Sequence, residues 1–282
     1  MDKIKFPDPK NKKKFYHYRN QYFTRGKIKK KILEYNSNFS GWSDKLTLMH
    51  EKISGKDHPI DLYSRENLIN NLKIDKKKTI LEIGCSNGWL IDDLRKKNKD
   101  VKYIGSDVVY EPLKKLSKKF SDIPFLRFDI TQNPLNRIKF NNIIMINVLE
   151  HIENDELAIQ QIYKLLKKNG RFFIEVPANQ FLYDNYDKEL KHFRRYKMSD
   201  LVKKLKKIGF TIEKKQHLGF FAFFPFLIIK LYNKIFNKNK IAKGQISFSN
   251  NLILKLLIKI EKKLSNVYFP FGIRCFLIAS KN

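Results

Sequence analysis

The segment LEIGCSNGWL, residues 81–90, constrains the fold more than any other part of this chain. A run of apolar residues meets a turn built from two glycines and small residues, and a helical pattern begins directly afterwards. A strand, a tight turn and a helix in immediate succession are typical of folds in which parallel strands alternate with helices. The small residues let the backbone pass close to a ligand at the start of the helix.

The same alternation continues along the chain. Strands are predicted at 79–84, 101–109, 124–130, 140–149, 171–178, 211–218 and 273–280, and helices at 89–97, 111–120, 153–170 and 198–210. This order predicts an α/β fold with a mostly parallel central sheet and helices on both of its faces. With 282 residues, 42% of them hydrophobic, the chain can bury such a core, which excludes a disordered protein.

Three acidic residues fall where predicted strands end. Glu82 lies inside the turn, Asp107 ends the second strand and Asp129 ends the third. Open α/β sheets bind ligands at the carboxyl ends of their strands, so we expect the three to share one site. Carboxylates there can accept hydrogen bonds from the hydroxyls of a ribose and from the amino group of an adenine. The turn matches neither the dinucleotide fingerprint nor the phosphate-binding loop, so it is not expected to hold a pyrophosphate.

On these residues the chain resembles the class I S-adenosylmethionine-dependent methyltransferases, over about residues 75–218 and 273–281. The resemblance implies a three-layer, Rossmann-like fold with a seven-stranded, mostly parallel sheet whose last strand is antiparallel. It also implies S-adenosylmethionine as the cofactor, with Asp107 on the ribose, Asp129 near the adenine, and the turn around the methionine part. The cofactor-binding residues that it implies are Glu82, Gly84, Cys85, Ser86, Gly88, Asp107, Asp129, Ile130 and Asn147.

Two histidines are candidates for a catalytic base. His151 follows the fourth strand, and His192 lies in KHFRRYK, after the fifth. In the family, both loops border the acceptor pocket. A base supplies about 10²–10⁴-fold in rate and orientation about 7–11 kcal/mol, so positioning is the larger effect. The alternatives are that His151 fixes its loop and that His192 packs or lies at the surface.

Three neighbours of His192 could bind an anionic group of the acceptor: Arg194, Arg195 and Tyr196. A solvated basic face is the alternative for this stretch. The histidines show no metal-ligand spacing, and neither Cys85 nor Cys275 belongs to a C-x-x-C pair, so no metal site is predicted.

Two segments lie outside the alternating pattern. Residues 1–74 are predicted to be a helical and basic N-terminal extension that precedes a methyltransferase core at 75–218. Residues 219–272 are predicted to be an apolar and basic helical insertion before the last core strand at 273–282. The charge-free stretch 218–229 would span about 18 Å as a helix, too short for a hydrocarbon core of about 30 Å. Two interpretations stay open for the insertion: it lies on a membrane surface, or it packs on the sheet as an acceptor lid or a dimer contact.

A net charge of +30 raises the question of a nucleic-acid partner. Of the 58 basic residues, however, only 10 are arginine, the residue preferred for specific recognition of nucleic acids and phosphate, which argues against that partner.

An apolar N-terminal segment is absent, which predicts a cytoplasmic protein, with the inner face of the membrane as an alternative location.

The predicted activity is methyl transfer to an oxygen of a small or lipid-linked acceptor, a quinone precursor or a carrier-linked glycan. The alternatives are an RNA methyltransferase and a non-catalytic membrane-associated protein with the same fold. The oligomeric state is left open.

Overall fold

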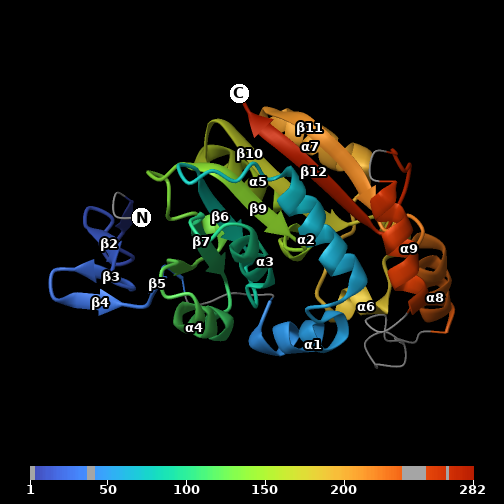
Figure 1. Ribbon diagram of the computed structural model, residues 1–282, viewed down its shortest axis with the longest axis horizontal. Coiled ribbons are helices and arrows are strands. Elements are labelled where there is room, and N and C mark those ends of the chain that lie inside the picture. Colours follow the sequence, from blue (N-terminus) through green and yellow to red (C-terminus); the bar gives the residue numbers. More distant parts are fainter. Residues whose placement is uncertain (1–3, 37–41, 237–251, 265–266) are drawn as a thin grey trace.

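The computed structural model describes residues 4–36, 42–236, 252–264 and 267–282. Its centre is an eight-stranded sheet with the strand order β11-β12-β10-β9-β6-β7-β8-β5 (Figure 1). Neighbouring strands are parallel except at β12, which is antiparallel to both β10 and β11. The strands span Ile32–Glu34 (β5), Thr79–Ile83 (β6), Lys102–Asp107 (β7), Phe125–Arg127 (β8), Phe140–Ile146 (β9), Leu166–Pro177 (β10), Phe210–Leu218 (β11) and Arg274–Lys281 (β12).

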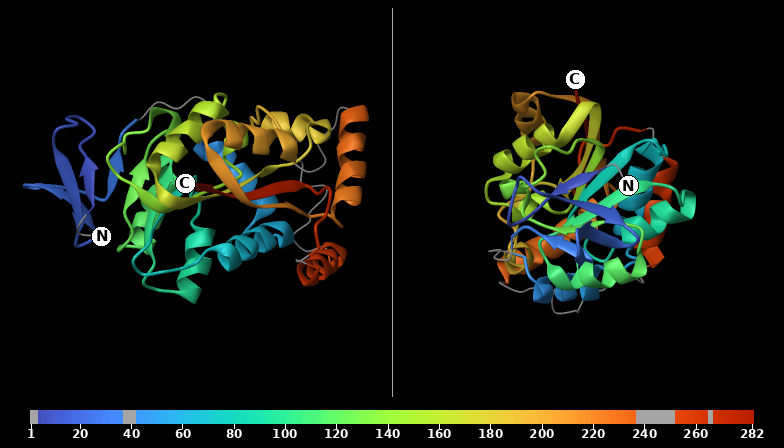
Figure 2. Two further views of the ribbon diagram at one scale, coloured as in Figure 1. Left: turned by 90° about the horizontal axis from the view of Figure 1, so that it is seen from above. Right: turned by 90° about the vertical axis from the view of Figure 1, so that its left-hand side faces the viewer.

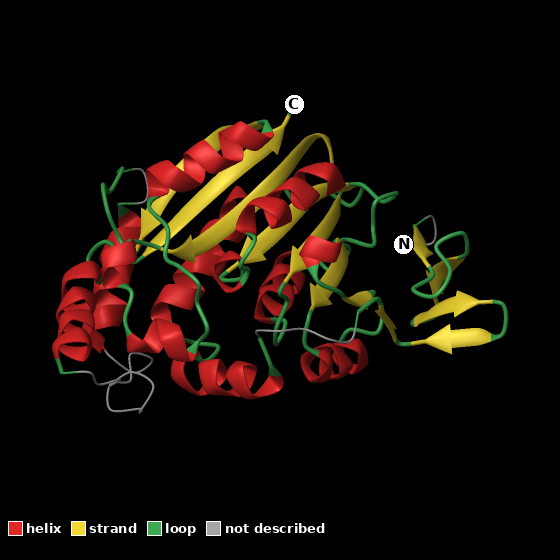
Figure 3. Ribbon diagram, turned by 180° about the vertical axis from the view of Figure 1, so that it is seen from behind, coloured by secondary structure: helices red, strands yellow, loops and turns green. Residues whose placement is uncertain are grey.

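Helices cover both faces of this sheet, because strand side chains alternate between two apolar cores. In β10, Phe172 and Ile174 belong to the core under α5 and α7, whereas Phe173 belongs to the core under α2, α3 and α4. Figures 1 and 3 show the two helix layers from opposite sides. The helices span Pro59–Asn71 (α2), Trp89–Lys97 (α3), Tyr110–Lys119 (α4), Asp155–Leu165 (α5) and Met198–Ile208 (α7). The predicted mostly parallel α/β architecture is therefore confirmed.

The sheet departs from the prediction at two places. Seven strands, β6 to β12, are those expected, and the last in sequence is antiparallel as predicted. An eighth strand, β5, pairs in parallel with β8 at the edge of the sheet and comes from the N-terminal extension. The helix predicted over 153–170 ends at Leu165, because β10 begins at Leu166 and carries a register irregularity before Arg171.

The first half of the N-terminal extension is β-structure, which corrects the helical prediction for it. Four antiparallel strands form a separate small sheet: Lys5–Pro7 (β1), Phe15–Arg19 (β2), Tyr22–Arg25 (β3) and Ile28–Lys30 (β4). The buried side chains of Tyr16 and Tyr18 in β2 and of Phe23 in β3 alternate with more exposed neighbours, a period of two that favours strands. Asn20 and Gln21 both have positive φ, as a two-residue hairpin turn requires. In this extension, described helices occur only from α1 (Asp44–Ser54) onward.

The insertion contributes two helices, α8 (Phe223–Ile235) and α9 (Leu252–Lys263). They lie at the end of the molecule opposite the small N-terminal sheet (Figures 1 and 2). Within the described ranges, every helix is too short or too polar to cross a bilayer. Short elements complete the loops around the sheet: Ile130–Gln132 (η1), Leu149–His151 (η2), Gln180–Leu182 (η3) and Asn185–Glu189 (α6).

Candidate active site

A cavity of about 1190 Å³ opens where β6, β7 and β9 end. Pockets for a single drug-sized ligand usually measure about 300–1,000 Å³, so this cavity can hold a cofactor and an acceptor together. The structure brings most of the predicted site residues to its walls. They are Glu82, Gly84, Cys85, Ser86, Asp107, Asp129, Ile130, Asn147, His151, His192 and Arg195.

The glycine turn adopts a conformation that only small residues tolerate. Gly84 has φ +77°, and a Cβ added there would lie 2.3 Å from Cγ2 of Val148. Ser86 also has positive φ, 42°, which is costly for a residue with a side chain and is often found at ligand sites. Gly88 does not line the cavity; a Cβ there would lie 2.5 Å from Leu116 of α4. Gly88 therefore serves the packing of α3 against α4.

Asp107 joins the turn to the end of β7. Its Oδ2 accepts a hydrogen bond from the backbone N–H of Ser86 (2.8 Å), and its Oδ1 accepts one from that of Val109 (3.0 Å). Burial raises the pKa of Asp107, although these backbone donors oppose the shift. The carboxylate is thus held in one orientation beside the turn.

The acids at the ends of β8 and β6 differ in their surroundings. Oδ1 of Asp129 accepts from both the backbone N–H and the hydroxyl of Thr131 (2.8 Å each), while Oδ2 accepts no hydrogen bond from the described residues. Glu82 is buried and accepts a hydrogen bond from the hydroxyl of Tyr103. Burial raises the pKa of Glu82 to about 8. A cationic or hydroxyl-bearing ligand would stabilise the ionised form of this group, whereas a phosphate would not.

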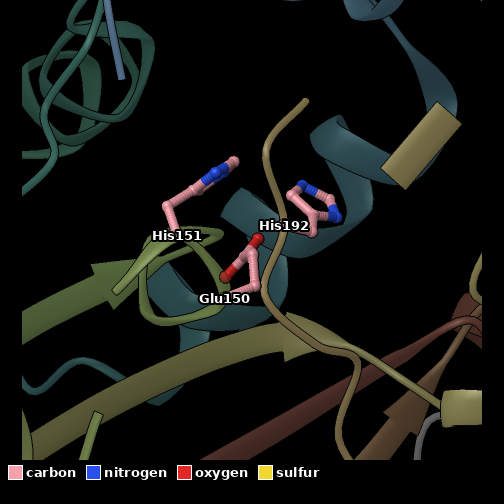
Figure 4. A group of neighbouring side chains, drawn as sticks. All are labelled: Glu150, His151 and His192. Atoms are coloured by element: carbon pink, nitrogen blue, oxygen red, sulfur yellow. The ribbon is translucent and has the colours of Figure 1, made fainter. Parts of the chain in front are cut away.

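The other side of the cavity carries a cluster of Glu150, His151 and His192 (Figure 4). Glu150 and His151 belong to η2, directly after β9, and His192 follows α6. The two imidazole rings meet edge to face with their centroids 4.6 Å apart, and the ring of Trp42 lies 4.4 Å from that of His151. The two predicted catalytic histidines are thus neighbours, although 41 positions separate them in the sequence.

His192 is oriented by a buried ionic network. Its Nδ1 lies 2.8 Å from Oδ1 of Asp187, which also accepts from Nε of Arg195 (2.9 Å). The ammonium of Lys230, in α8, donates to Asp187 (2.8 Å) and to Asp184 (2.6 Å). Burial lowers the pKa of His192 despite the carboxylate beside it. The imidazole is therefore neutral at pH 7, with Nε2 on the side away from Asp187.

Two predicted substrate-binding residues are not brought to the cavity. The guanidinium of Arg194 donates to the carbonyl oxygens of Ile152 (3.2 Å) and Glu153 (2.8 Å). The hydroxyl of Tyr196 is buried and donates to Asp155 (2.9 Å). Both side chains hold the loop after β9 through these hydrogen bonds and do not line the cavity. This corrects the expectation that they contact the acceptor.

A second ionic group at the cavity was missed by the sequence analysis. Glu175 of β10 accepts a hydrogen bond from the hydroxyl of Ser64 (2.6 Å) and one from the guanidinium of Arg274 (2.8 Å), which also donates to Asp61. Burial raises the pKa of Glu175. The partners come from α2, β10 and β12, so no local motif contains them. The one signal in the sequence is an acid inside an apolar strand, FFIEVP.

The insertion closes the cavity with apolar side chains. Pro225 and Phe226 of α8, and Leu254 and Leu257 of α9, lie in its wall. The part of the cavity that faces the histidines is therefore bounded by hydrocarbon on one side and by charged groups on the other. This arrangement can bind an acceptor that has both a polar reacting group and an apolar part.

Residues 58–215 match a family model described as a methyltransferase domain. The putative methyltransferase YrhH of Bacillus subtilis (strain 168) is 24% identical over 141 residues, which is 45% of this chain and 78% of that protein. A putative sarcosine dimethylglycine methyltransferase from Galdieria sulphuraria has a similar structure, with TM-score 0.56 and 14% identity over 85% of this chain and 99% of that one.

A second solved structure with this fold contains a product of the cofactor. It is phosphoethanolamine N-methyltransferase 2 of Haemonchus contortus, in complex with phosphomonomethylethanolamine and S-adenosylhomocysteine. Its TM-score is 0.56 and its identity 15%, over 83% of this chain and 57% of that one. At such identities, the solved structures show the shared fold alone.

The cofactor of the family is S-adenosylmethionine, and the residues of this chain suit it. The small residues of the turn line the cavity, and within the described part of the chain Oδ2 of Asp129 accepts no hydrogen bond, so it can accept one from a ligand. Because the family model spans more than half of the chain, this protein belongs to the S-adenosylmethionine-dependent methyltransferases.

Proposed function

We propose that this methyltransferase transfers a methyl group to an oxygen of a small or lipid-linked acceptor, such as a quinone precursor or a carrier-linked glycan. The observation that carries the proposal is one continuous cavity. Its walls include the glycine turn, the cluster of Glu150, His151 and His192, and apolar side chains of α8 and α9. A donor at the turn and an acceptor beside the histidines would meet in this space.

On the cofactor side, we assign Asp107 to the ribose hydroxyls and Asp129 to the adenine amino group. When bound, S-adenosylmethionine supplies an electrophilic methyl group on a sulfonium. The two backbone donors on Asp107 hold its carboxylate in place, so little conformational entropy is lost when the ribose binds. Asn147, with φ +50° at the end of β9, would face the methionine part.

On the acceptor side, His192 is the better-placed base. With Nδ1 turned to Asp187, Nε2 can take the proton of an acceptor hydroxyl as its oxygen attacks the methyl carbon. Asp187 would then stabilise the imidazolium that forms. Such a base contributes about 10²–10⁴-fold, which matters more for a sugar hydroxyl than for a phenol.

The apolar wall supports an acceptor with a lipid part, and the outer surfaces of α8 and α9 support a location on a membrane. Twelve of the sixteen large hydrophobic side chains exposed in the described part of the chain lie between Phe224 and Tyr268. Lys255, Lys259 and Lys263 are exposed on the same segment. Near an anionic bilayer each lysine would contribute about 1 kcal/mol, in addition to the burial of the apolar side chains.

Calorimetric titration with S-adenosylhomocysteine tests the cofactor site. We expect Asp107→Asn to weaken binding at least tenfold, because the amide cannot accept hydrogen bonds with both of its polar atoms. The control is Asp100→Asn, an exposed carboxylate that pairs with Lys76. If Asp107→Asn binds as tightly as the wild type, Asp107 does not hold the cofactor.

The acceptor class is tested by incubating the protein with methyl-labelled S-adenosylmethionine and a total cell extract. The proposal requires label in an organic-solvent fraction or in a small polar fraction, as an ether that resists mild base. It also requires His192→Gln to reduce the rate at least a hundredfold. Label recovered in RNA would instead support an RNA methyltransferase.

A further inference from the structure

Glu150, His151 and His192 come from two separate loops and place three potential metal ligands around one point. Their ligand atoms all lie within 4.8 Å of one another. Figure 4 shows the three side chains around a common space, with the carboxylate of Glu150 near both rings. All three line the cavity, so an ion between them would keep an open position on the cavity side.

Glu150 is buried, and one of its two carboxylate oxygens lacks a hydrogen bond within the described part of the chain. The residue is 1% exposed, and Oε2 accepts no hydrogen bond from any residue that the structure describes. An ionised carboxylate with an unpaired, buried oxygen is costly, and a cation beside that oxygen would offset the cost.

His192 is held in the way that metal-binding histidines are held. Asp187 interacts with Nδ1, which fixes the ring and leaves Nε2 for a ligand. Histidines that bind metals almost always have such a carboxylate, carbonyl or water on the other ring nitrogen.

The surrounding charges permit a cation. Lys230 and Arg195 are the basic groups nearest to His192 in the network, and two carboxylates, those of Asp184 and Asp187, pair with them. Glu150 belongs to none of these pairs, although the charges of Arg274 and Arg195 also act on its carboxyl group.

We propose that Glu150, His151 and His192 bind one divalent transition-metal ion. Two imidazoles and one carboxylate, with a further position open, are a ligand set used for catalytic zinc and for related ions. Ligand atoms around such an ion lie about 2.0–2.2 Å from it, so the three side chains would close in by about 1 Å on binding. The spacing of the histidines in the sequence does not predict this metal site. The three ligands come together only when the chain folds.

The role of the ion, unlike its binding, rests on the proposed function. An acceptor hydroxyl at the open position would lose its proton to water, because the ion stabilises the oxyanion. The oxygen lone pair would then form the bond to the methyl carbon, and the carbon–sulfur bond would break with its electron pair left on sulfur. With the ion bound, His192 would be a metal ligand and not the base. The ion, in place of His192, would then activate the acceptor hydroxyl.

Equilibrium dialysis of the full chain against Zn²⁺, with elemental analysis, tests the binding. We expect one equivalent per chain for the wild type and at least tenfold weaker binding for Glu150→Gln and for His192→Gln. His17→Gln, in the separate N-terminal sheet, is the control for adventitious binding and should bind like the wild type. Wild-type protein that binds no Zn²⁺, or variants that bind it equally well, would overturn the proposal.

Two further measurements distinguish a loss of metal binding from a loss of folding or of cofactor binding. Asp187→Asn, a positioning variant, should weaken Zn²⁺ binding about 10–100-fold while S-adenosylhomocysteine still binds. Substitution of Co²⁺ in the wild type should give the visible d–d bands of a site with nitrogen and oxygen ligands, and their absence would count against the site even if the variants fail to fold. Protein that binds S-adenosylhomocysteine but no metal would refute this inference and leave the proposed function standing.

Discussion

At the scale of single residues, the cofactor side of the cavity depends on backbone conformations that most side chains disfavour. Gly84, Ser86 and Asn147 all have positive φ, and all three line the cavity. A left-handed conformation costs a residue with a Cβ about 1–2 kcal/mol, and surrounding contacts must stabilise it. For Ser86 that contact is the hydrogen bond to Asp107.

Gly84→Ala should therefore destabilise the protein and weaken its affinity for the cofactor. The added methyl would overlap Cγ2 of Val148 at 2.3 Å, so the turn must shift as well as bear the backbone strain. We expect a loss of about 2–4 kcal/mol in unfolding free energy, together with at least tenfold weaker binding of S-adenosylhomocysteine.

The matched control is Gly26→Ala. Gly26 also has positive φ, but a Cβ there meets nothing within 4 Å. Gly26→Ala should lower the free energy of unfolding by only about 1 kcal/mol and leave the affinity for the cofactor unchanged. Equal effects of the two substitutions, measured by urea unfolding and calorimetry, would show that the contact with Val148 is unimportant.

At the scale of elements, the insertion is built into the fold by two buried charges. Lys230 attaches α8 to Asp184 and Asp187 in the loop that carries His192. Glu261 of α9 accepts a hydrogen bond from the backbone N–H of Gly219 (2.8 Å). The buried ends of these two contacts hold α8 and α9 in place as a wall of the cavity.

Lys230→Met should be strongly destabilising. It leaves buried Asp184 without its cation and removes one of the two cations that pair with Asp187, a change that typically costs about 3–5 kcal/mol. Lys234→Met, one helical turn later at an exposed position near the end of α8, should change the stability by less than about 0.5 kcal/mol. Equilibrium unfolding in urea measures both, and similar values for the two variants would contradict the buried network.

The link between α5 and α7 should make stability depend on acid pH. Burial acts to raise the pKa of Asp155, but hydrogen bonds from Lys204 and Tyr196 outweigh it and the pKa is lowered. A carboxylate whose pKa is lowered on folding stabilises the protein above its unfolded value of about 3.9, and this contribution is lost as pH falls through the folded value.

Asp155→Asn should thus show a smaller loss of stability between about pH 5 and pH 3 than the wild type does. Asp200→Asn, an exposed residue in the first turn of α7, is the control and should follow the wild-type profile. Parallel profiles for the wild type and Asp155→Asn, measured by urea unfolding at each pH, would be inconsistent with the lowered pKa.

At the scale of the whole molecule, the two ends differ in character. The small N-terminal sheet lies at one end, and α8 and α9, with their exposed apolar residues, lie at the other (Figure 2). Because these helices also line the cavity, the membrane location that we propose would place the cavity next to the bilayer.

The double variant Ile228→Ser, Leu256→Ser should reduce binding to vesicles that contain anionic lipid. Both side chains are more than half exposed, on α8 and α9, and each would contribute about 1–3 kcal/mol if it entered the interface. Leu48→Ser, an equally exposed leucine on α1, is the control. Wild-type protein that stays in the supernatant at low salt would refute the membrane location.

The sequence by itself determined the α/β core and the cofactor side of the site. Strand and helix periods, the glycine turn and acids at strand ends are all local signals, and parallel strands bring their carboxyl ends to one edge without further information. Residues 5–34 carried an equally local signal, the alternation of Tyr16, Tyr18 and Phe23, which predicts the hairpins that the structure contains.

Only the tertiary structure decided the acceptor side. Glu150 meets His192, Glu175 meets Ser64 and Arg274, and Lys230 meets Asp187 across long stretches of chain. Buried charges of this kind are stable only when partners from several elements satisfy them together, so their roles depend on the packing of those elements. For the same reason Arg194 and Tyr196, beside His192 in the sequence, turn to Asp155 instead of to the cavity.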